Sequence, residues 1–209
     1  MPKDFLNRPQ RSLLAALEKL GLVGSFHLAG GAGLAHYLRH RKTQALDFFT
    51  DAELDVQAIL GALSKRYHVQ VLRQAAHTLT LKANKVLVSF FVHAFPPVGK
   101  MMTSEAGIRI ASMLDIAAMK LTAIAGRGSR KDFIDLYFVC RKGIALEEVL
   151  DTVAKRYRRV EYDSYHILRS LTYFDDAEKE AMPEMLIDVD WKQVKEFFRG
   201  EARRLFRGF

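Results

Sequence analysis

Two adjacent glycines followed by a single carboxylate are the residues of this chain that most clearly suggest chemistry. Gly30 and Gly31 stand between a short apolar strand and a predicted helix, in the segment LAGGAGLAHYLRHRKTQALDFF. Glycine permits a sharp turn because it has no Cβ, and the free N–H groups at the start of a helix favour an anion such as a triphosphate. Asp47 projects from the next predicted strand, where it could hold a divalent metal against those phosphates. This pattern predicts a site for nucleotidyl transfer.

The same segment resembles the nucleotidyltransferase family of the AbiEii/AbiGii toxins, which belongs to the polymerase-β-like superfamily. The residues that match its pattern are Gly30, Gly31, His40, Arg41, Asp47, Phe48 and Phe49. Thr43 is a conservative replacement of the family serine. Ala32 stands where the family has a turn hydroxyl, and Ala45 stands where it has the first metal-binding aspartate. A second block, DIAAMKLTAIAGRGSRKDFIDLY, resembles the downstream lysine and Lys-Asp-x-x-Asp-Leu motif.

The resemblance implies a nucleotidyltransferase that uses a nucleoside triphosphate and Mg²⁺. Its acceptor would be an RNA, such as tRNA, or a protein, and its setting toxin–antitoxin pairing or phage defence, with a cognate antitoxin as a further partner. Lys120 would contact the nucleotide phosphates, and Asp132 or Asp135 would position or deprotonate the acceptor hydroxyl. The residues expected to contact the nucleotide are Gly30, Gly31, Arg41, Thr43, Arg127 and Lys131.

The expected metal site is short of carboxylates. Ala45 and Asp47 share one face of a strand, since side chains alternate with period 2. The neighbouring strand, residues 85–93, would supply a third carboxylate, but it contains no acid and has Ser89 at the expected position. Asp47 is therefore the one predicted metal ligand. Losing one electrostatic contact of this kind costs roughly 10²–10³ in rate, unless Arg41 and Lys42 supply the positive charge instead.

Each candidate also has a structural interpretation. Asp47 could make structural hydrogen bonds at the end of its strand, and Lys120 could extend along an apolar helix to reach water. Asp132 and Asp135 could complement the dipole of a helix N-terminus, and Arg41 could belong to a solvated turn. Two further sets have mainly structural interpretations: His40 is expected to anchor the turn to the second strand, and the pairs 48–49, 90–91 and 197–198 are expected in the core. Asp51, Glu53 and Asp55 are expected to cap or solvate a helix.

Composition points to a protein of the reducing cytoplasm. The chain has 209 residues, 49% of them hydrophobic, which is enough for one core or for a small α/β domain with a helical companion. Cys140 is the single cysteine, so no intrachain disulfide can form, and no apolar run is long enough to span a membrane. The net charge of +8 favours polyanions such as RNA and nucleotides.

The hydrophobic periodicity predicts an α+β fold, with a small mixed-sheet nucleotidyltransferase-type domain followed by an α-helical lobe. Strands are expected over residues 26–29, 45–49, 68–73, 78–82 and 85–93, and helices dominate after residue 112. Pro96-Pro97 marks the best internal boundary, which gives domains of residues 1–98 and 99–209. We expect Asp47, Lys120 and the Gly30-Gly31 turn to line one cleft between the two.

Two other functions compete with nucleotidyl transfer. A degenerate family member could bind a nucleotide, an RNA or a partner protein without catalysis, and the shortage of carboxylates favours that reading. The intact second block favours the enzyme. The third alternative is a basic RNA-binding domain unrelated to nucleotides, in which the Gly-Gly turn would have no role.

Overall fold

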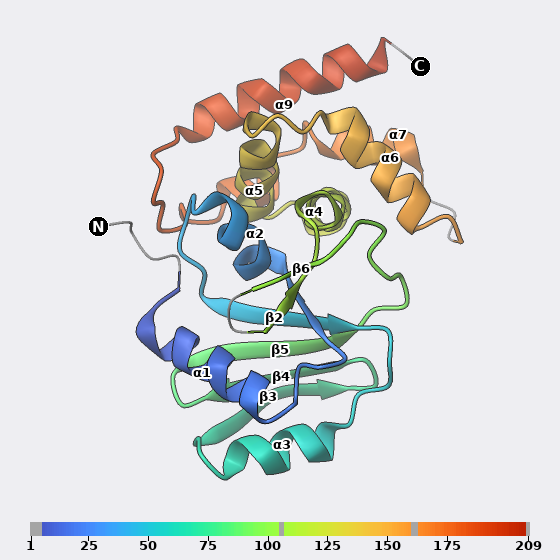
Figure 1. Ribbon diagram of the computed structural model, residues 1–209. Coiled ribbons are helices and arrows are strands. Elements are labelled where there is room, and N and C mark those ends of the chain that lie inside the picture. The colour runs from blue at the N-terminus through green and yellow to red at the C-terminus, as the bar shows by residue number, and fades with distance from the viewer. Residues whose placement is uncertain (1–5, 105–106, 160–162, 208–209) are drawn as a thin grey trace.

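In the part of the chain that the structure describes, a mixed sheet of seven strands forms the base of the molecule, and helices form the upper lobe (Figure 1). The computed structural model describes residues 6–104, 107–159 and 163–207. The strands are β1 (His27–Ala29), β2 (Ala45–Thr50), β3 (Val69–Ala75), β4 (Thr78–Ala83), β5 (Val86–Val92), β6 (Met102–Thr103) and β7 (Arg109–Ile110). Their order across the sheet is β3-β4-β5-β2-β1-β7-β6. The predicted α+β class with a mixed sheet is confirmed.

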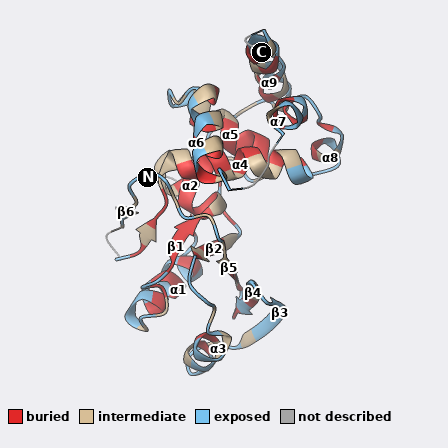
Figure 2. Ribbon diagram, turned by 90° about the vertical axis from the view of Figure 1, so that its right-hand side faces the viewer, coloured by how far each residue is buried: buried red, intermediate tan, exposed pale blue. Residues whose placement is uncertain are grey.

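The helices form two groups: one lies against a face of the sheet, and the other gathers at one end of it. They are α1 (Arg8–Lys19), α2 (Gly30–Leu38), α3 (Val56–Ser64), α4 (Met113–Arg127), α5 (Arg130–Arg141), α6 (Leu146–Arg156), α7 (Ser164–Ser170), α8 (Asp175–Glu178) and α9 (Trp191–Phe206). Figure 2 shows α1 and α3 on the same side of the sheet, with α4 to α9 gathered at its upper end. None of the described helices is long and apolar enough to cross a bilayer.

The two central strands separate a fully buried core face from a partly exposed face. β2 and β5 run parallel, with Asp47 paired in register with Ser89. Leu46 and Phe48 are fully buried in a core that includes residues of α1 and α3, whereas Asp47 on the opposite face is only partly buried. This alternation is the period-2 pattern of a strand, and it turns Asp47 away from the sheet core.

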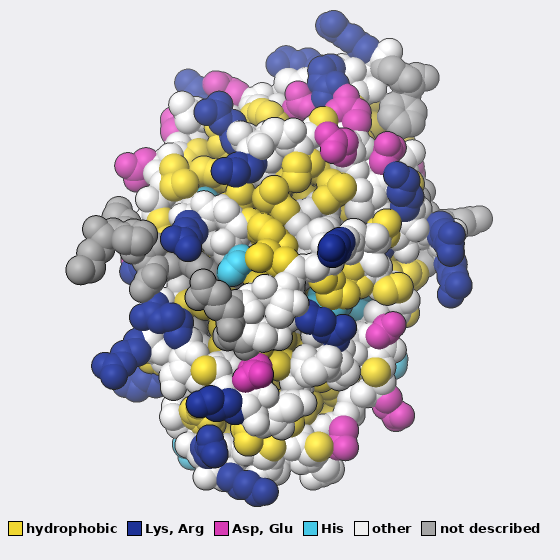
Figure 3. All heavy atoms as spheres, viewed as in Figure 1, with side chains coloured by type: hydrophobic (Ala, Val, Ile, Leu, Met, Phe, Trp, Pro, Cys, Tyr) yellow, Lys and Arg dark blue, Asp and Glu magenta, His cyan; other side chains and the backbone are white. Residues whose placement is uncertain are grey.

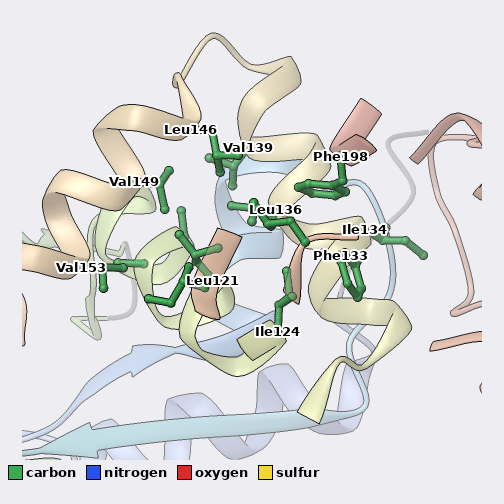
Figure 4. Close-up of a cluster of buried hydrophobic side chains, with 14 of the residues drawn as sticks. Leu121, Ile124, Phe133, Ile134, Leu136, Val139, Leu146, Val149, Val153 and Phe198 are labelled. Atoms are coloured by element: carbon green, nitrogen blue, oxygen red, sulfur yellow. The ribbon is translucent and has the colours of Figure 1, made fainter. Parts of the chain in front are cut away.

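A second core holds the helical lobe together. Leu121 of α4, Phe133 and Leu136 of α5, Val149 of α6 and Phe198 of α9 belong to one cluster of buried apolar side chains (Figure 4). α2 lies between the two cores, since its Leu34 joins the helical cluster whereas its Ala32 joins the sheet cluster. The lobe is thereby fixed beside the start of α2, where the phosphate site was predicted.

The sheet continues past the predicted boundary at residue 98. β7 pairs in parallel with β1 and β6 pairs with β7, so two short strands from residues 102–110 extend the sheet on the β1 side. The helical lobe begins with α4 at Met113. The division into domains 1–98 and 99–209 stays a prediction.

Candidate nucleotide-binding site

A cleft of about 1570 Å³ lies between the partly exposed face of the sheet and the helical lobe. Gly30, Gly31, Asp47 and Lys120 all line it, as do Arg127 and Lys131 at the junction of α4 and α5. The prediction that the two sequence blocks meet at one cleft is confirmed. The functional roles of these residues remain predictions.

The Gly-Gly turn lies close against the side chains of Asp47 and Arg41, so a side chain at either glycine would displace one of them. Gly30 has a φ of +57°, and a Cβ there would lie 2.6 Å from Oδ2 of Asp47. A Cβ on Gly31 would lie 2.6 Å from Nη2 of Arg41. α2 begins at this turn with Ala29 as its N-cap, and no side chain of the described residues caps its N-terminal amides. The turn therefore offers N–H donors and a positive dipole end to the cleft.

The carboxylate of Asp47 accepts no hydrogen bond from the residues that the structure describes. Among the described residues none donates to it, so the structural hydrogen bonds considered as its alternative role are absent. Burial raises the pKa of the Asp47 carboxyl above its ordinary value, although the positive charges of Lys120, Lys131, Arg127 and Arg41 act in the opposite direction. A desolvated carboxylate surrounded by cations is typical of a functional site.

Asp135 is the centre of a buried ion-pair network. Its Oδ1 accepts hydrogen bonds from Nε2 of His40 and Nε of Arg41, both at 2.7 Å. Its Oδ2 lies 2.7 Å from Nη2 of Arg41 and 2.7 Å from Nζ of Lys120. Although burial alone would raise the pKa of Asp135, Lys120 and Arg41 hold it well below its ordinary value. His40 thus anchors the turn as expected, but to α5 rather than to the second strand.

Lys120 does not extend to solvent but joins α4 to α5. Its Nζ lies 2.8 Å from Oδ1 of Asp132 and its side chain is 7% exposed. Burial tends to lower the pKa of Lys120, but Asp135 and Asp132 outweigh it and raise the pKa. Asp132 is fully buried and also binds Arg127, 2.9 Å from Nε. Both aspartates are thus occupied by cations, which makes them suited to positioning Lys120, Arg41 and Arg127.

The other residues considered for phosphate contact differ in exposure and in whether they already have a partner in the protein. Lys131 is exposed in the cleft, and it has no ion-pair partner within the described part of the chain. Arg127 is 61% exposed although it pairs with Asp132. Lys42 is paired with Glu184. The Thr43 hydroxyl donates to the Ala45 carbonyl at 2.9 Å, so its proton is not available to a phosphate. Lys131 and Arg127 are therefore the cations best placed for an incoming anion.

The donor set does not fit a resident metal centre. Across the described residues, no group of three or more His, Cys, Asp or Glu side chains is arranged to hold a metal ion. Ala45 lines the cleft beside Asp47, and Ser89 pairs with Asp47 in register, so the strand positions expected to carry carboxylates carry none. Asp55 caps α3 by accepting from the Ala58 N–H and so serves a structural role, as expected. Positive side chains, rather than ligands for a cation, surround Asp47.

Two features of the cleft could not be found from the sequence motifs. The segment 180–186 lines one wall, where the Lys42 N–H donates to the Glu184 carbonyl. Its only signal in sequence is Pro183, which interrupts the helical pattern. Phe49 and Phe91 are partly buried and also line the cleft, and Phe49 packs against the apolar core of the helical lobe, so the pair belongs to the core only in part. Ala32, by contrast, is fully buried in the sheet core, so a hydroxyl at that position would not face the cleft.

Comparison with known proteins agrees with this architecture. The family described as nucleotidyl transferase AbiEii toxin, type IV TA system, matches residues 12–207. This chain belongs to the AbiEii family. The protein aq_aa25 of Aquifex aeolicus (strain VF5) is 37% identical over 202 residues, which cover 95% of this chain and 96% of that protein.

Two solved structures share the fold of this AbiEii family member at low sequence identity. MenT4, a nucleotidyltransferase toxin from Mycobacterium tuberculosis H37Rv, is 13% identical, with a TM-score of 0.58 over 92% of this chain and 82% of MenT4. JHP933 from Helicobacter pylori is 16% identical, with a TM-score of 0.56 over 97% of this chain and 94% of JHP933. These likenesses establish the nucleotidyltransferase fold.

Proposed function

We propose that this protein binds a nucleoside triphosphate in the cleft and transfers its nucleotidyl group to an acceptor hydroxyl. The observation that carries the proposal is the arrangement around Asp47: an uncapped helix N-terminus at Gly30-Gly31 and exposed cations at Arg127 and Lys131 line the same cleft. Helix N-termini and cationic side chains are the groups that proteins use to hold phosphates and to stabilise their transfer.

Asp47 is the carboxylate that we assign to the acceptor. Asp132 and Asp135 are fully buried and paired with cations, whereas Asp47 lines the cleft and accepts no hydrogen bond from the described part of the chain. In the proposed step the acceptor hydroxyl gives its proton to Asp47, its oxygen bonds to the α-phosphorus, and pyrophosphate leaves. A carboxylate with a raised pKa is a better proton acceptor near neutral pH than an ordinary one. Asp132 and Asp135 act as positioning residues for Lys120 and Arg41.

A second candidate function is binding without transfer. Ala45 and Ser89 occupy the strand positions where carboxylates were expected, and this favours a family member that holds a nucleotide, an RNA or a partner protein. Both functions share the phosphate site. They differ in whether a covalent product forms.

A label-transfer assay separates the two. The protein is incubated in cell lysate, where unknown acceptors are present, with each α-³²P-labelled nucleoside triphosphate in turn. For the enzyme we expect labelled RNA or protein that disappears with Asp47→Asn. For the binding module we expect no transfer by the parent. If the site is a degraded metal site, Ala45→Asp should restore transfer, because residue 45 lines the cleft on the same strand face as Asp47.

The family suggests the biological setting, which we also propose here. The protein would act in the cytoplasm, as a toxin neutralised by an antitoxin protein or as part of phage defence, with tRNA or another RNA as its acceptor and Mg²⁺ accompanying the nucleotide. Growth arrest on expression, lost with Asp47→Asn, tests the toxin role. Growth unaffected by the parent protein would contradict it.

A further inference from the structure

One hydroxyl group of the cleft has no role in the function proposed above. Within the described part of the chain, the cleft-lining side chains that carry a hydroxyl are Thr43 and Ser89. The Thr43 hydroxyl donates to the Ala45 carbonyl at 2.9 Å, so its proton is already used. Ser89 is different: it is only 5% exposed, it lines the cleft, and it stands on the strand where a third carboxylate was expected.

The Ser89 hydroxyl is held through its oxygen, and its proton is unused. Oγ1 of Thr80 on β4 donates a hydrogen bond to Oγ of Ser89 at 3.2 Å. No residue that the structure describes accepts the proton of Ser89 in return. A serine hydroxyl can donate one hydrogen bond as well as accept, and buried donors normally have a partner. The structure therefore leaves one hydroxyl proton available inside the cleft.

Strand pairing places Ser89 beside Asp47, on the side away from the phosphate site. Asp47 is in register with Ser89 on β5 and with Ala29 on β1. Gly30 follows Ala29, and a Cβ on Gly30 would lie 2.6 Å from Oδ2 of Asp47. Neighbouring strands are ~4.8 Å apart. The Asp47 carboxylate thus lies between the turn proposed to hold the phosphates and the Ser89 hydroxyl.

We propose that the protein transfers a nucleotidyl group to its own Ser89. The inference rests on the proposed function, because it uses the same triphosphate site and the same base. The Ser89 proton passes to Asp47, and Oγ of Ser89 bonds to the α-phosphorus. The bond between the α-phosphorus and the oxygen of the β-phosphate breaks, so pyrophosphate leaves and a phosphodiester joins Ser89 to the nucleoside. A hydroxyl side chain becomes a nucleophile when an adjacent group accepts its proton.

The burial of Ser89 predicts a reaction within one molecule. A side chain that is 5% exposed inside a cleft cannot reach the site of a second molecule. The modified fraction should therefore rise at a rate that does not depend on protein concentration. In a mixture of the parent with ¹⁵N-labelled Asp47→Asn, only the isotopically normal parent should gain a nucleotide.

The test locates the nucleotide on the chain. Lys and Arg side chains are spread over the face of the molecule seen in Figure 3 and can retain nucleotide by charge alone, so the total label is not sufficient. Trypsin cleavage after Lys85 and Lys100 releases residues 86–100, in which Ser89 is the only residue with a hydroxyl. Purified protein is incubated with each nucleoside triphosphate, with and without Mg²⁺, and the peptide is examined by mass spectrometry. We expect it to gain one nucleoside monophosphate less water, through a linkage that survives mild acid, unlike a phosphoramidate on His93.

Four variants define the expected signature. Ser89→Ala should abolish the modification, whereas Ser89→Thr keeps a hydroxyl and should restore part of it. Asp47→Asn should slow the modification by about 10²-fold or more, which is the usual contribution of a general base. Thr80→Val removes the donor to Ser89 and should slow it by about 2- to 10-fold, since one neutral hydrogen bond contributes modestly. The matched control is Thr78→Val, two residues earlier on β4, which should leave the rate unchanged.

The other outcomes would overturn the inference. Modification that persists in Ser89→Ala would assign it to another residue. Transfer to an acceptor in lysate, without modification of residues 86–100, would refute the inference and leave the proposed function standing. Neither modification nor transfer would refute both, and triphosphate binding in calorimetry would then identify the binding module.

Discussion

Replacing Asp135 with Asn should destabilise the protein far more than any surface charge change. The carboxylate is fully buried. It accepts hydrogen bonds from His40 and from Nε and Nη2 of Arg41, and it forms an ion pair with Lys120. Asn would keep one acceptor oxygen but place an NH₂ donor against donors of Arg41 or Lys120. Breaking a buried ion pair by removing one partner costs about 3–5 kcal/mol, because the remaining charges are left uncompensated.

The loss is measurable by urea unfolding followed by circular dichroism at pH 7. For a chain of this size, about 3–5 kcal/mol corresponds to a fall in melting temperature of roughly 6–20 °C. The matched control is Asp176→Asn, which removes an exposed i,i+3 pair with Lys179 and should cost at most about 0.5 kcal/mol.

The pH dependence carries a further check. The pKa of Asp135 is held well below 3.8 in the folded protein. The contribution of Asp135 to the free energy of unfolding is therefore fully present above pH 3.8 and is lost as the pH falls through the folded pKa. The difference in unfolding free energy between the parent and the Asp135→Asn variant should therefore be constant from pH 5 to 8. A cost below about 1 kcal/mol at pH 7 would refute the buried-network reasoning.

Three further predictions concern the cleft itself. Gly30→Ala should lower the unfolding free energy by about 1–2 kcal/mol, because φ is +57° there, and should weaken nucleotide binding by displacing Asp47. Gly61→Ala in α3, where a Cβ meets nothing within 4 Å, should instead raise the unfolding free energy by about 0.5–1 kcal/mol in the same urea assay. Asp47→Asn should raise the unfolding free energy at pH 7. The pKa of Asp47 is raised in the folded protein, so the stability of the parent falls as the pH rises above 3.8 through the folded pKa. Denaturation curves at pH 4 and pH 7 check the sign of this stability change. Lys131→Ala should weaken triphosphate binding about tenfold in calorimetry without changing the melting temperature, because the side chain is exposed and has no ion-pair partner among the described residues. An equal effect of Lys142→Ala would contradict this.

Local sequence patterns were sufficient to predict the five longer strands of this fold. The alternation in ALDFFT places Leu46 and Phe48 inside and Asp47 outside, and the structure follows it. The meeting of Gly30-Gly31 with Lys120 was predicted because the two blocks belong to one family pattern. The sheet strands at residues 102–103 and 109–110 are two residues long, too short for periodicity to reveal how far the sheet extends.

The parts of the site that escaped prediction depend on long-range contacts. Nothing local to Asp135 indicates that His40, Arg41 and Lys120 converge on it from two other segments. The sequence DFFT likewise cannot tell which phenylalanine is covered: Phe48 lies under α1 and α3, whereas Phe49 faces the cleft. Whether a strand face is covered depends on the helices packed against it, and that packing is not encoded within the strand.

The most direct test of the account is nucleotide binding with and without Mg²⁺. The central claim is that the phosphates are held by the α2 N-terminus, Arg127 and Lys131 rather than by a metal clamp. Isothermal titration calorimetry with a non-hydrolysable triphosphate analogue should give dissociation constants in EDTA and in Mg²⁺ that differ by less than about tenfold. Binding that appears only when Mg²⁺ is present would contradict the account.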